Sequence, residues 1–390
     1  MFKNFRKKYI SSDLESPVDK NLLWAFVLLI ILGLYFLASA SAVSSFQLVG
    51  HSYHYLKEQI VPLIVGAILC FVFYKIDYRY FKRVAFLALI VSIVLLILVF
   101  IPALSLETYS SRSWINIFGR SFQPSELVKL TFLVYLATWL ESKKGELKKI
   151  ESGTIPFIVV VSIISLLIML QPDFGTLVII LTTAVVTFFV GGGNYKHLGV
   201  VFLLLVILAS SFLYSRFSSS EGTGYQEKRI ACYLDPSHDR QGSCYQINQA
   251  LISIGSGGLW GRGIGQSRQK FLFIPKIHND AIFPIIAEEI GFIFTLLLVS
   301  LYLYIFYRGY LIAKEAPDIY GRSLAFGIVA WLSIQTFFNI GGMSNLIPMT
   351  GTTLPFISHG GSSLISAMAA MGILLNISRY KVEKPKYAKR

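Results

Sequence analysis

Asp280 is the residue of this sequence best placed for acid–base chemistry. It ends the segment Pro275-Lys276-Ile277-His278-Asn279-Asp280 and directly precedes a long apolar stretch. A carboxylate at the edge of such a stretch is partly removed from water, which raises its pKa toward values useful for a general base. The alternative interpretation is that Asp280 caps the following helix. His278 could tune this carboxylate, or it could form only local hydrogen bonds.

Glu126, Lys129 and Asp173 also lie in or beside apolar stretches, where ionisable groups are costly and therefore suggest function. Glu126 and Lys129 are three positions apart, so they share a helix face. They could line a polar cavity in which Lys129 meets a phosphate, or they could form a structural ion pair. Asp173 follows Gln171-Pro172 in a tight turn. It could face the same cavity or cap the next helix.

The segment 348–363 is the densest run of helix-breaking residues beside an apolar stretch. Non-helical backbone at membrane depth survives only where protein surrounds it or where it lines a watery cavity. We therefore expect this segment to form a cavity wall, with an ordinary external loop as the alternative. The adjacent residues Glu288 and Glu289 cannot both face one side of a helix, and we expect mainly structural pairing for them.

Membrane-spanning helices must position these residues. Hydrophobic residues make up 54% of the 390 and charged residues 14%, whereas soluble domains contain roughly 25% charged residues. One soluble core cannot bury so much apolar side chain. A span needs about 20 mostly apolar residues. We expect an all-α integral membrane protein with about ten such helices, near residues 22–43, 60–76, 84–102, 126–140, 155–170, 174–191, 197–214, 281–306, 323–344 and 360–377.

The distribution of Lys and Arg predicts the orientation of these helices. An even number of spans places both termini on one side, and the segments on that side carry 23 Lys and Arg residues, against 3 in the short loops opposite. Short loops rich in Lys and Arg stay in the cytoplasm. We therefore expect a cytoplasmic tail over 1–21, a membrane domain over 22–378 and a cytoplasmic basic tail over 379–390. The first apolar stretch is too long for a cleavable signal peptide.

The segment 215–280 would then be a large extracellular loop. Its second half is apolar enough to form short membrane-associated helices. The net charge of +14 follows mainly from topology and contact with anionic lipid, and no basic-aromatic module supports nucleic-acid binding. Cys232 and Cys244 lie in this loop, where a disulfide would stabilise by roughly 2–3 kcal/mol. Metal ligation with His238 is the weaker alternative, and Cys70 is expected to pack inside a span.

Several short motifs occur in a fixed order along nearly the whole chain. They are Arg112-Ser113-Trp114-Ile115, Gln123-Pro124-Ser125-Glu126 with Lys129, Gln171-Pro172-Asp173-Phe174-Gly175-Thr176, Arg229, Leu234-Asp235-Pro236, Tyr245-Gln246, Gly258-Leu259-Trp260-Gly261-Arg262-Gly263, His278-Asn279-Asp280, Glu288-Glu289-Ile290-Gly291, Asn339, the segment from Pro348 to Pro355, and Ser358-His359-Gly360-Gly361-Ser362-Ser363. In this order they resemble the SEDS family (shape, elongation, division and sporulation), the peptidoglycan polymerases that include the FtsW, RodA and SpoVE proteins.

The particular residues in individual motifs refine this resemblance. Leu259-Trp260-Gly261, with Ser267 and Lys270 after it, is more similar to the division branch, FtsW, than to the elongation branch, RodA. Three residues depart from the family's pattern, since Thr or Ser is usual at Asn279, Tyr at His359 and a small residue at Pro284. These departures weaken the assignment to a branch but leave Asp280 in place.

The resemblance implies inverting glycosyl transfer on lipid II, an undecaprenyl-pyrophosphate-linked disaccharide pentapeptide. The 4-hydroxyl of one GlcNAc would attack the anomeric carbon of a second lipid-linked sugar. A β-1,4 bond would form and undecaprenyl pyrophosphate would leave. Asp280 would take the proton of the attacking hydroxyl. Cations would stabilise the developing charge of the leaving group, and the candidates are Lys129 held by Glu126, Arg112 and Arg229.

The remaining candidates for substrate contact are Asp173, His278 and Ser362. Asp173 could orient the acceptor or bind a divalent cation, because carboxylates and phosphates suit Mg²⁺ or Mn²⁺. No ligand cluster in the sequence establishes such a metal site. Apolar grooves between helices would hold the lipid tails.

The resemblance also implies a partner and a location. The partner would be a class B penicillin-binding protein, a transpeptidase, within the divisome or elongasome. The chain would lie in the bacterial plasma (inner) membrane with its catalytic face extracellular or periplasmic. The competing interpretations are a lipid II flippase, an elongation-type polymerase and a non-catalytic scaffold. Transporters bind substrate near the membrane midplane, whereas Asp280 and Arg229 are expected at the outer face.

Overall fold

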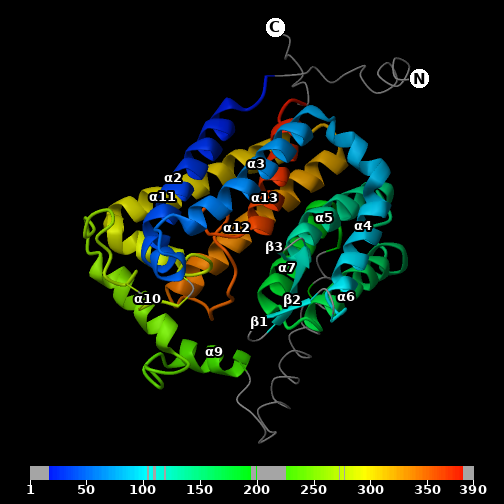
Figure 1. The fold of residues 1–390 in the computed structure, drawn as a ribbon. Helices are drawn as coiled ribbons and strands as arrows, with labels where there is room; N and C mark the ends of the chain where they lie inside the picture. The colour runs from blue at the N-terminus through cyan, green and yellow to red at the C-terminus, as the bar shows by residue number, and fades with distance from the viewer. Residues whose placement is uncertain are drawn as a thin grey trace, which may run out of the picture.

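A computed structural model describes residues 17–380 apart from 103–104, 109–110, 118–119, 195–198, 200–224, 272 and 276. The described chain is mainly helical (Figure 1). Six helical segments in it are long and apolar enough to cross a membrane. They are α2 (Lys20–Val49), α3 (His54–Lys75), η1 with α4 (Tyr78–Tyr80 and Phe81–Leu98), η2 with α6 (Ile150–Thr154 and Ile155–Met169), α11 (Ile282–Glu315) and α12 (Ile319–Met343).

Further helices complete the described fold. Two are shorter but apolar, α7 (Phe174–Val190) and α13 (Gly361–Ile377), and the others are α5 (Pro124–Ser142), α9 (Tyr225–Leu234) and α10 (Tyr245–Ser256). Each predicted span that falls on described residues coincides with one of these helices. The predicted span 197–214 lies outside the described residues apart from residue 199, so the count of ten stays a prediction.

The expectation of an all-α fold is wrong at residues 105–122. Strands β1 (Ser105–Thr108), β2 (Ser111–Ile117) and β3 (Arg120–Phe122) form an antiparallel sheet in the order β1-β2-β3. Ile115 pairs with both Ser105 and Phe122. The aromatic and β-branched residues Trp114, Ile115 and Ile117 favour a strand along β2, and the elements are too short for the span-length criterion to detect. The sheet leads directly into α5, which carries Glu126 and Lys129.

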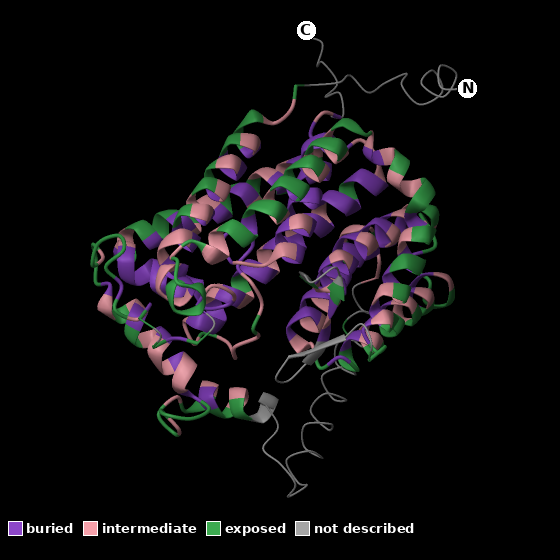
Figure 2. Cartoon of the chain, viewed as in Figure 1, coloured by how far each residue is buried: buried purple, intermediate pink, exposed green. Residues whose placement is uncertain are grey.

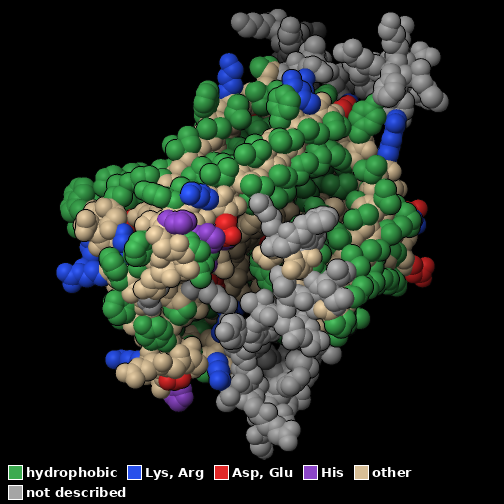
Figure 3. Space-filling model, viewed as in Figure 1, with side chains coloured by type: hydrophobic (Ala, Val, Ile, Leu, Met, Phe, Trp, Pro, Cys, Tyr) green, Lys and Arg blue, Asp and Glu red, His purple; other side chains and the backbone are tan. Residues whose placement is uncertain are grey.

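The apolar surface of the helices identifies a multi-pass membrane protein. Large hydrophobic side chains point outward along the long helices, as with Trp24 at 68%, Phe86 at 69% and Phe292 at 62% exposure. Figure 3 shows hydrophobic side chains covering a broad band of the visible face. Soluble monomers rarely expose contiguous apolar patches larger than a few hundred Å², whereas lipid solvates such a surface without cost. Figure 2 shows that the buried residues lie mainly between the helices.

Helix α13 lies at the centre of the helix assembly. Almost every residue from Ser362 to Ile377 is buried, and α13 contacts α3, α5, α11 and α12. Two glycines permit its close approach to α3. A Cβ atom at Gly66 would lie 2.7 Å from Sδ of Met368, and one at Gly372 would collide with the carbonyl oxygen of Cys70. Small residues at helix interfaces are the usual means of tight packing within membranes.

Helix α11 is broken at Gly291, and a loop fills the break. Gly291 has φ 76° and ψ 179°. The loop after α10 replaces the lost helical hydrogen bonds, with Phe292 N donating to Gly258 O at 2.9 Å and Gly263 N donating to Glu289 O at 3.0 Å. This join fixes the first turns of α11, and therefore the position of Asp280 just before them.

Candidate active site

Asp280 closes a turn at the start of α11. Its side chain is only 6% exposed. The N-cap of α11 is Ala281, whose side chain makes no capping hydrogen bond. Its carbonyl oxygen accepts a hydrogen bond of 2.7 Å from Nδ2 of Asn339 on α12. Asp280 is thus a nearly buried carboxyl group whose backbone is anchored to a neighbouring helix.

Two amide side chains of α12 hold the segment 349–353 in place. Asn339 donates from Nδ2 to the carbonyl oxygen of Thr352 at 2.7 Å. Gln335 lies one helical turn earlier and donates from Nε2 to the carbonyl oxygen of Thr353 at 3.0 Å. Residues four apart share a helix face. One face of α12 therefore fixes both Asp280 and this non-helical segment.

Glu126 and Lys129 form a buried ion pair on α5. The Nζ atom of Lys129 lies 2.7 Å from Oε1 of Glu126, and the two side chains are 2% and 7% exposed. The same Nζ donates to Oε1 of Gln335 at 2.8 Å and lies 5.1 Å from the ring centroid of Trp331. This burial favours the structural ion pair over the direct phosphate contact that was expected for Lys129. Through Gln335, the pair supports the segment 349–353.

Asp173 caps α7 and links it to α5. Its Oδ1 accepts from the backbone N of Thr176 at 3.1 Å, and its Oδ2 accepts from Nε2 of Gln123 at 2.9 Å. The backbone N of Gln123 donates in turn to Oγ of Ser362 at 3.0 Å. Asp173 and Ser362 therefore join the beginnings of α7, α5 and α13. In this arrangement the capping interpretation of Asp173 holds, and both residues act first as connectors.

Arg229 on α9 packs against the backbone of residues 349–351. Its Nη1 donates to the carbonyl oxygen of Met349 at 3.0 Å. A Cβ atom at position 351 would lie 3.1 Å from Nη2 of Arg229, and Gly351 has φ +74°. Only glycine adopts that φ freely, so Gly351 serves both the turn and the close approach of the guanidinium group.

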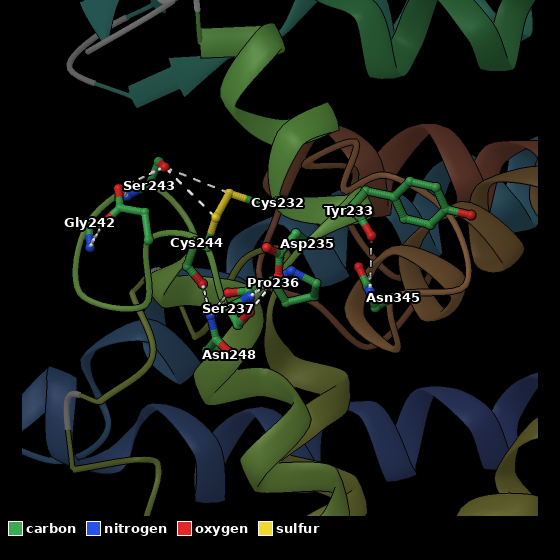
Figure 4. Close-up of a disulfide and its surroundings, with 11 residues drawn as sticks. Cys232, Tyr233, Asp235, Pro236, Ser237, Gly242, Ser243, Cys244, Asn248 and Asn345 are labelled. Carbon is green, nitrogen blue, oxygen red and sulfur yellow. Dashed lines mark hydrogen bonds between the residues drawn. A yellow bond between two sulfur atoms is a disulfide. The ribbon is translucent and has the colours of Figure 1, made fainter.

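Cys232 and Cys244 form the disulfide that the sequence analysis expected, with their Cα atoms 5.2 Å apart. The bond joins α9 to the start of α10 (Figure 4). Both cysteines are buried against Ile247, and Met349 packs on the same cluster. The disulfide therefore ties the helix that carries Arg229 to α10, and Met349, which Arg229 contacts, packs against the same cluster. Cys70 is a free cysteine in α3. The two sulfurs of Cys232 and Cys244 are bonded to each other, so the alternative of metal ligation with His238 is wrong.

Residues 349–353 are where the predicted site residues come together. A Cβ atom at Gly175, near the start of α7, would lie 2.8 Å from the carbonyl oxygen of Thr350. The segment is non-helical, and its residues are partly buried apart from Gly351, which is exposed. Its role as a cavity wall stays a prediction. Its neighbours are Arg229 at Met349, the start of α7 at Thr350, Asn339 at Thr352 and Gln335 at Thr353.

Three ring side chains cluster where the turns before α11 and α13 meet the start of α3. His278 stacks on Tyr55 with ring centroids 3.7 Å apart, and His359 meets Tyr55 edge-on at 5.3 Å. The backbone N of His359 donates to the carbonyl oxygen of His278 at 2.7 Å. Burial lowers the pKa of His359, although the Glu58 carboxylate opposes that shift. The ring cluster joins the turn before α11 to the turn before α13.

Glu288 and Glu289 are both buried and both paired. Glu288 accepts from Oγ of Ser267 at 2.6 Å and lies 3.4 Å from Nε of Arg262. Glu289 lies 3.1 Å from Nζ of Lys270, and Ser39 on α2 donates to both of its oxygens. The two carboxylates anchor the loop after α10 on α11, which agrees with the structural roles expected for them.

Two predicted features of the site have no counterpart among the described side chains. The side chain of Arg112 lies outside the described residues, although its backbone belongs to β2. No group of three or more His, Cys, Asp or Glu side chains that could hold a metal ion occurs in the described part of the chain. Asp173 in particular is engaged with Gln123 and Thr176.

Sequence reasoning missed the role of Gln335 and left Asn339 without one. A signal was present, because the two amide residues stand four apart within a mainly apolar span. Polar amides at that spacing share one helix face, and inside a membrane they hydrogen-bond to neighbouring elements. Their partners are backbone carbonyls, which carry no sequence signature. The stacking of Tyr55 on His278 was not expected either.

Comparison with known proteins agrees with the order of the motifs. Residues 20–383 match the family model of the FtsW, RodA and SpoVE cell cycle proteins. The stage V sporulation protein E of Bacillus subtilis is 41% identical over 354 residues, covering 91% of this chain and 95% of that protein. A probable peptidoglycan glycosyltransferase FtsW of Geobacter metallireducens is 35% identical over 360 residues, covering 92% and 94%.

A solved structure supports the same relationship. It describes the coordination of polymerization and crosslinking by a peptidoglycan synthase complex. One of its chains superposes with a TM-score of 0.75 at 27% sequence identity, and the match covers 93% of this chain and 98% of that one.

Proposed function

This chain belongs to the family of FtsW, RodA and SpoVE cell cycle proteins, and from that premise we propose that it polymerises lipid II into β-1,4-linked glycan strands. Its activity is that of a peptidoglycan glycosyltransferase, the activity for which its FtsW-type relatives are named. Lipid II is the substrate that the resemblance implies. The observation that carries the assignment of the site is the nearly buried carboxyl group of Asp280, held where α11, α12 and the segment 349–353 meet.

We propose that Asp280 is the general base. The 4-hydroxyl of the acceptor sugar is a poor nucleophile, so its proton must move to a base as the new bond forms. Attack on the anomeric carbon breaks its bond to the pyrophosphate, which leaves with the electron pair. The anchoring of Asp280 by Asn339 supports this role, because a base must be held within hydrogen-bonding reach of the reacting hydroxyl.

The cations are assigned different roles. Arg112 remains the candidate for contact with the leaving pyrophosphate. Lys129 is assigned a positioning role, since its ammonium group binds Glu126 and Gln335. Arg229 lies in a pocket that Asp280 does not line, and a separate role for it is argued below. We derive no step through a divalent cation. A requirement for Mg²⁺ or Mn²⁺ stays a prediction, tested by polymerisation with and without a chelator.

We further propose a division-type role with a crosslinking partner. Several relatives are named FtsW, and the similar solved structure is of a complex that couples polymerization to crosslinking. A class B penicillin-binding protein would supply the crosslinking activity at the outer membrane face, with both termini of this chain in the cytoplasm. Copurification with candidate partners, and complementation of cells depleted of division-type or elongation-type polymerase, would test the two parts separately.

The central test is polymerisation of purified lipid II by the purified chain with its candidate partner. Asp280→Asn keeps the size of the side chain but removes the base, so we expect the rate of strand formation to fall by about 10²–10⁴-fold. Glu151→Gln, which removes an exposed carboxylate at η2, is the matched control and should retain the rate. Glycan strands are measured on a gel.

Two outcomes would count against the proposal. Strands formed at the normal rate by Asp280→Asn would refute the assignment of the base. No strands from either protein, with partner and divalent cations supplied, would refute the polymerase and direct attention to a lipid II translocation assay.

A further inference from the structure

A pocket of about 110 Å³ lies between α9, the start of α10 and the connection from α12 to α13. Its lining includes two cationic side chains, Lys228 and Arg229, and two amide side chains, Gln246 and Asn345. Its apolar lining includes Ile247 and Met349, with the sulfur of Cys232 beside them. Figure 4 shows four of the lining residues, Cys232, Tyr233, Ser243 and Asn345. We call it the disulfide pocket.

The walls of the disulfide pocket are fixed by covalent and hydrogen bonds. The Cys232–Cys244 bond ties α9 to α10, and Arg229 is held to the carbonyl oxygen of Met349. Nδ2 of Asn248 donates to the carbonyl oxygen of Pro236 at 2.6 Å, which holds the intervening loop against α10. A site that is already ordered loses less entropy when a ligand binds. The pocket is therefore built to receive a ligand without rearrangement.

The chemistry of the lining selects a carboxylate on a short apolar stem. A guanidinium group binds a carboxylate through paired hydrogen bonds, and Lys228 adds a second positive charge. The apolar side chains of Ile247 and Met349 would contact carbon atoms, which a bare phosphate does not offer. A cavity of about 150 Å³ admits benzene, so a space of 110 Å³ suits a group the size of a terminal alanine residue.

We propose that the disulfide pocket binds the terminal carboxylate of the peptide carried by the glycan substrate. This inference rests on the proposed function, because it concerns the substrate of that reaction. The pocket is connected to the catalytic turn through residues 349–353: Arg229 binds Met349, and Asn339 binds both Thr352 and Asp280. Contact with a remote part of the substrate adds binding energy that is equal in the ground state and the transition state, and such energy lowers KM. The pocket would thus recognise the peptide while Asp280 acts on the sugar.

The first experiment compares two forms of lipid II, one ending in a free carboxylate and one in a carboxamide. With the free carboxylate, Arg229→Gln should raise KM about tenfold and Lys228→Gln about threefold, with kcat changed by less than about twofold. With the carboxamide, the wild-type enzyme should already show the raised KM, and neither variant should raise it further. Arg240→Gln removes an exposed charge from the same loop outside the pocket and is the matched control.

Equal effects of Arg229→Gln on the two substrates would overturn the proposal, because the cation would then not act on the carboxylate. Thermal unfolding of each variant, in the same detergent, separates loss of binding from loss of folding. The amide substrate serves as an internal control, since a misfolded variant would lose kcat with both substrates.

A binding measurement keeps the proposal testable even if the chain makes no polymer. The probes are N-acetylated dialanine as the free acid, its carboxamide and inorganic phosphate, each titrated into the full-length wild-type chain and the Arg229→Gln variant. We expect the free acid to bind the wild type with Kd on the order of 1 mM, and the variant and the carboxamide to give at least about tenfold weaker binding. Binding of the carboxamide as tight as that of the acid, or tighter binding of phosphate, would overturn the carboxylate assignment. Absence of polymer with selective binding of the acid would instead refute only the proposed function.

Discussion

At the scale of single residues, the ammonium group of Lys129 shows how burial decides a role. Its nearest oxygens belong to Glu126 and Gln335, and Oε2 of Glu126 has no hydrogen-bond partner among the described residues. The charge on Lys129 is therefore needed first to compensate a buried carboxylate. A cation engaged in this way can support catalysis only by positioning Gln335 and the segment that Gln335 holds.

Removing the charges of Glu126 and Lys129 tests whether Lys129 positions other residues or acts on the substrate directly. Lys129→Gln should destabilise the fold by about 3–5 kcal/mol, because it leaves the carboxylate of Glu126 buried without its cation. The double variant Glu126→Gln with Lys129→Gln should recover most of that stability and most of the polymerisation rate. Thermal unfolding in lipid nanodiscs and strand formation are the measurements. A stable double variant without activity would show that the Lys129 ammonium acts on the substrate.

The lowered pKa of His359 leads us to expect that the folded protein loses stability in acid. Burial lowers its pKa in the folded protein, so the unfolded chain, with a pKa near about 6.5, binds the proton more readily. The contribution of His359 to stability is thus complete above that pH and falls as the pH drops below it. Melting temperatures between pH 8 and pH 5 should fall less steeply for His359→Gln than for the wild type. Parallel curves would contradict this account.

At the scale of elements, the loop after α10 and the break in α11 form one unit. The backbone of Gly261 lies very close to that of Gly291. A Cβ atom on either glycine would collide with backbone atoms of the segment opposite it. Glu288 and Glu289 hold the same loop through their side chains. The first turns of α11, and Asp280 before them, therefore depend on two glycines that make no side-chain contact at all.

A pair of glycine substitutions tests this unit. Gly291→Ala places a Cβ against Gly261 and requires φ +76°, so we expect destabilisation of about 2 kcal/mol or more, with loss of activity. Gly255→Ala, in α10, meets no atom within 4 Å and should be neutral or slightly stabilising. Melting temperature and strand formation are measured for both. Equal behaviour of the two variants would show that the close approach is unimportant.

The sequence predicted elements better than it predicted contacts. Each helix from α2 to α13 that corresponds to an apolar stretch was located, because the length of an apolar run reports a span directly. The sheet β1-β2-β3 was missed, since short strands leave no such signal. Asp280 was selected by its position at a span edge, but its anchor Asn339 binds carbonyl oxygens. A sequence does not reveal which backbone groups a side chain will bind. It also gave no indication that Lys129 would donate a hydrogen bond to Gln335.

At the scale of the whole molecule, the apolar outer surface indicates contact with lipid, and the distribution of Lys and Arg predicts which end of the bundle faces the cytoplasm. The outward side chains of the long helices are apolar, and the predicted orientation places Asp280, the disulfide and the disulfide pocket outside the cell. That placement suits the oxidising conditions that maintain a disulfide.

Labelling of single cysteines tests this orientation. In a Cys70→Ala background, Gln266→Cys in the loop after α10 should react with a membrane-impermeant maleimide on intact cells. Lys148→Cys, in the exposed turn between α5 and α6, should react only after the membrane is made permeable, because the positive-inside rule places that turn in the cytoplasm. The reverse pattern of labelling would invert the predicted topology.

The central position of α13 bears on how the protein is made. The helix that α13 packs against most closely, α3, enters the membrane early in synthesis, and almost the whole chain must be translated before α13 follows. At about 5–20 residues per second, α3 waits on the order of tens of seconds before α13 can pack on its surface at Gly66 and Cys70. The described bundle is therefore completed only after α13 has been inserted. If the incomplete bundle were degraded before α13 is inserted, the yield of active enzyme would fall.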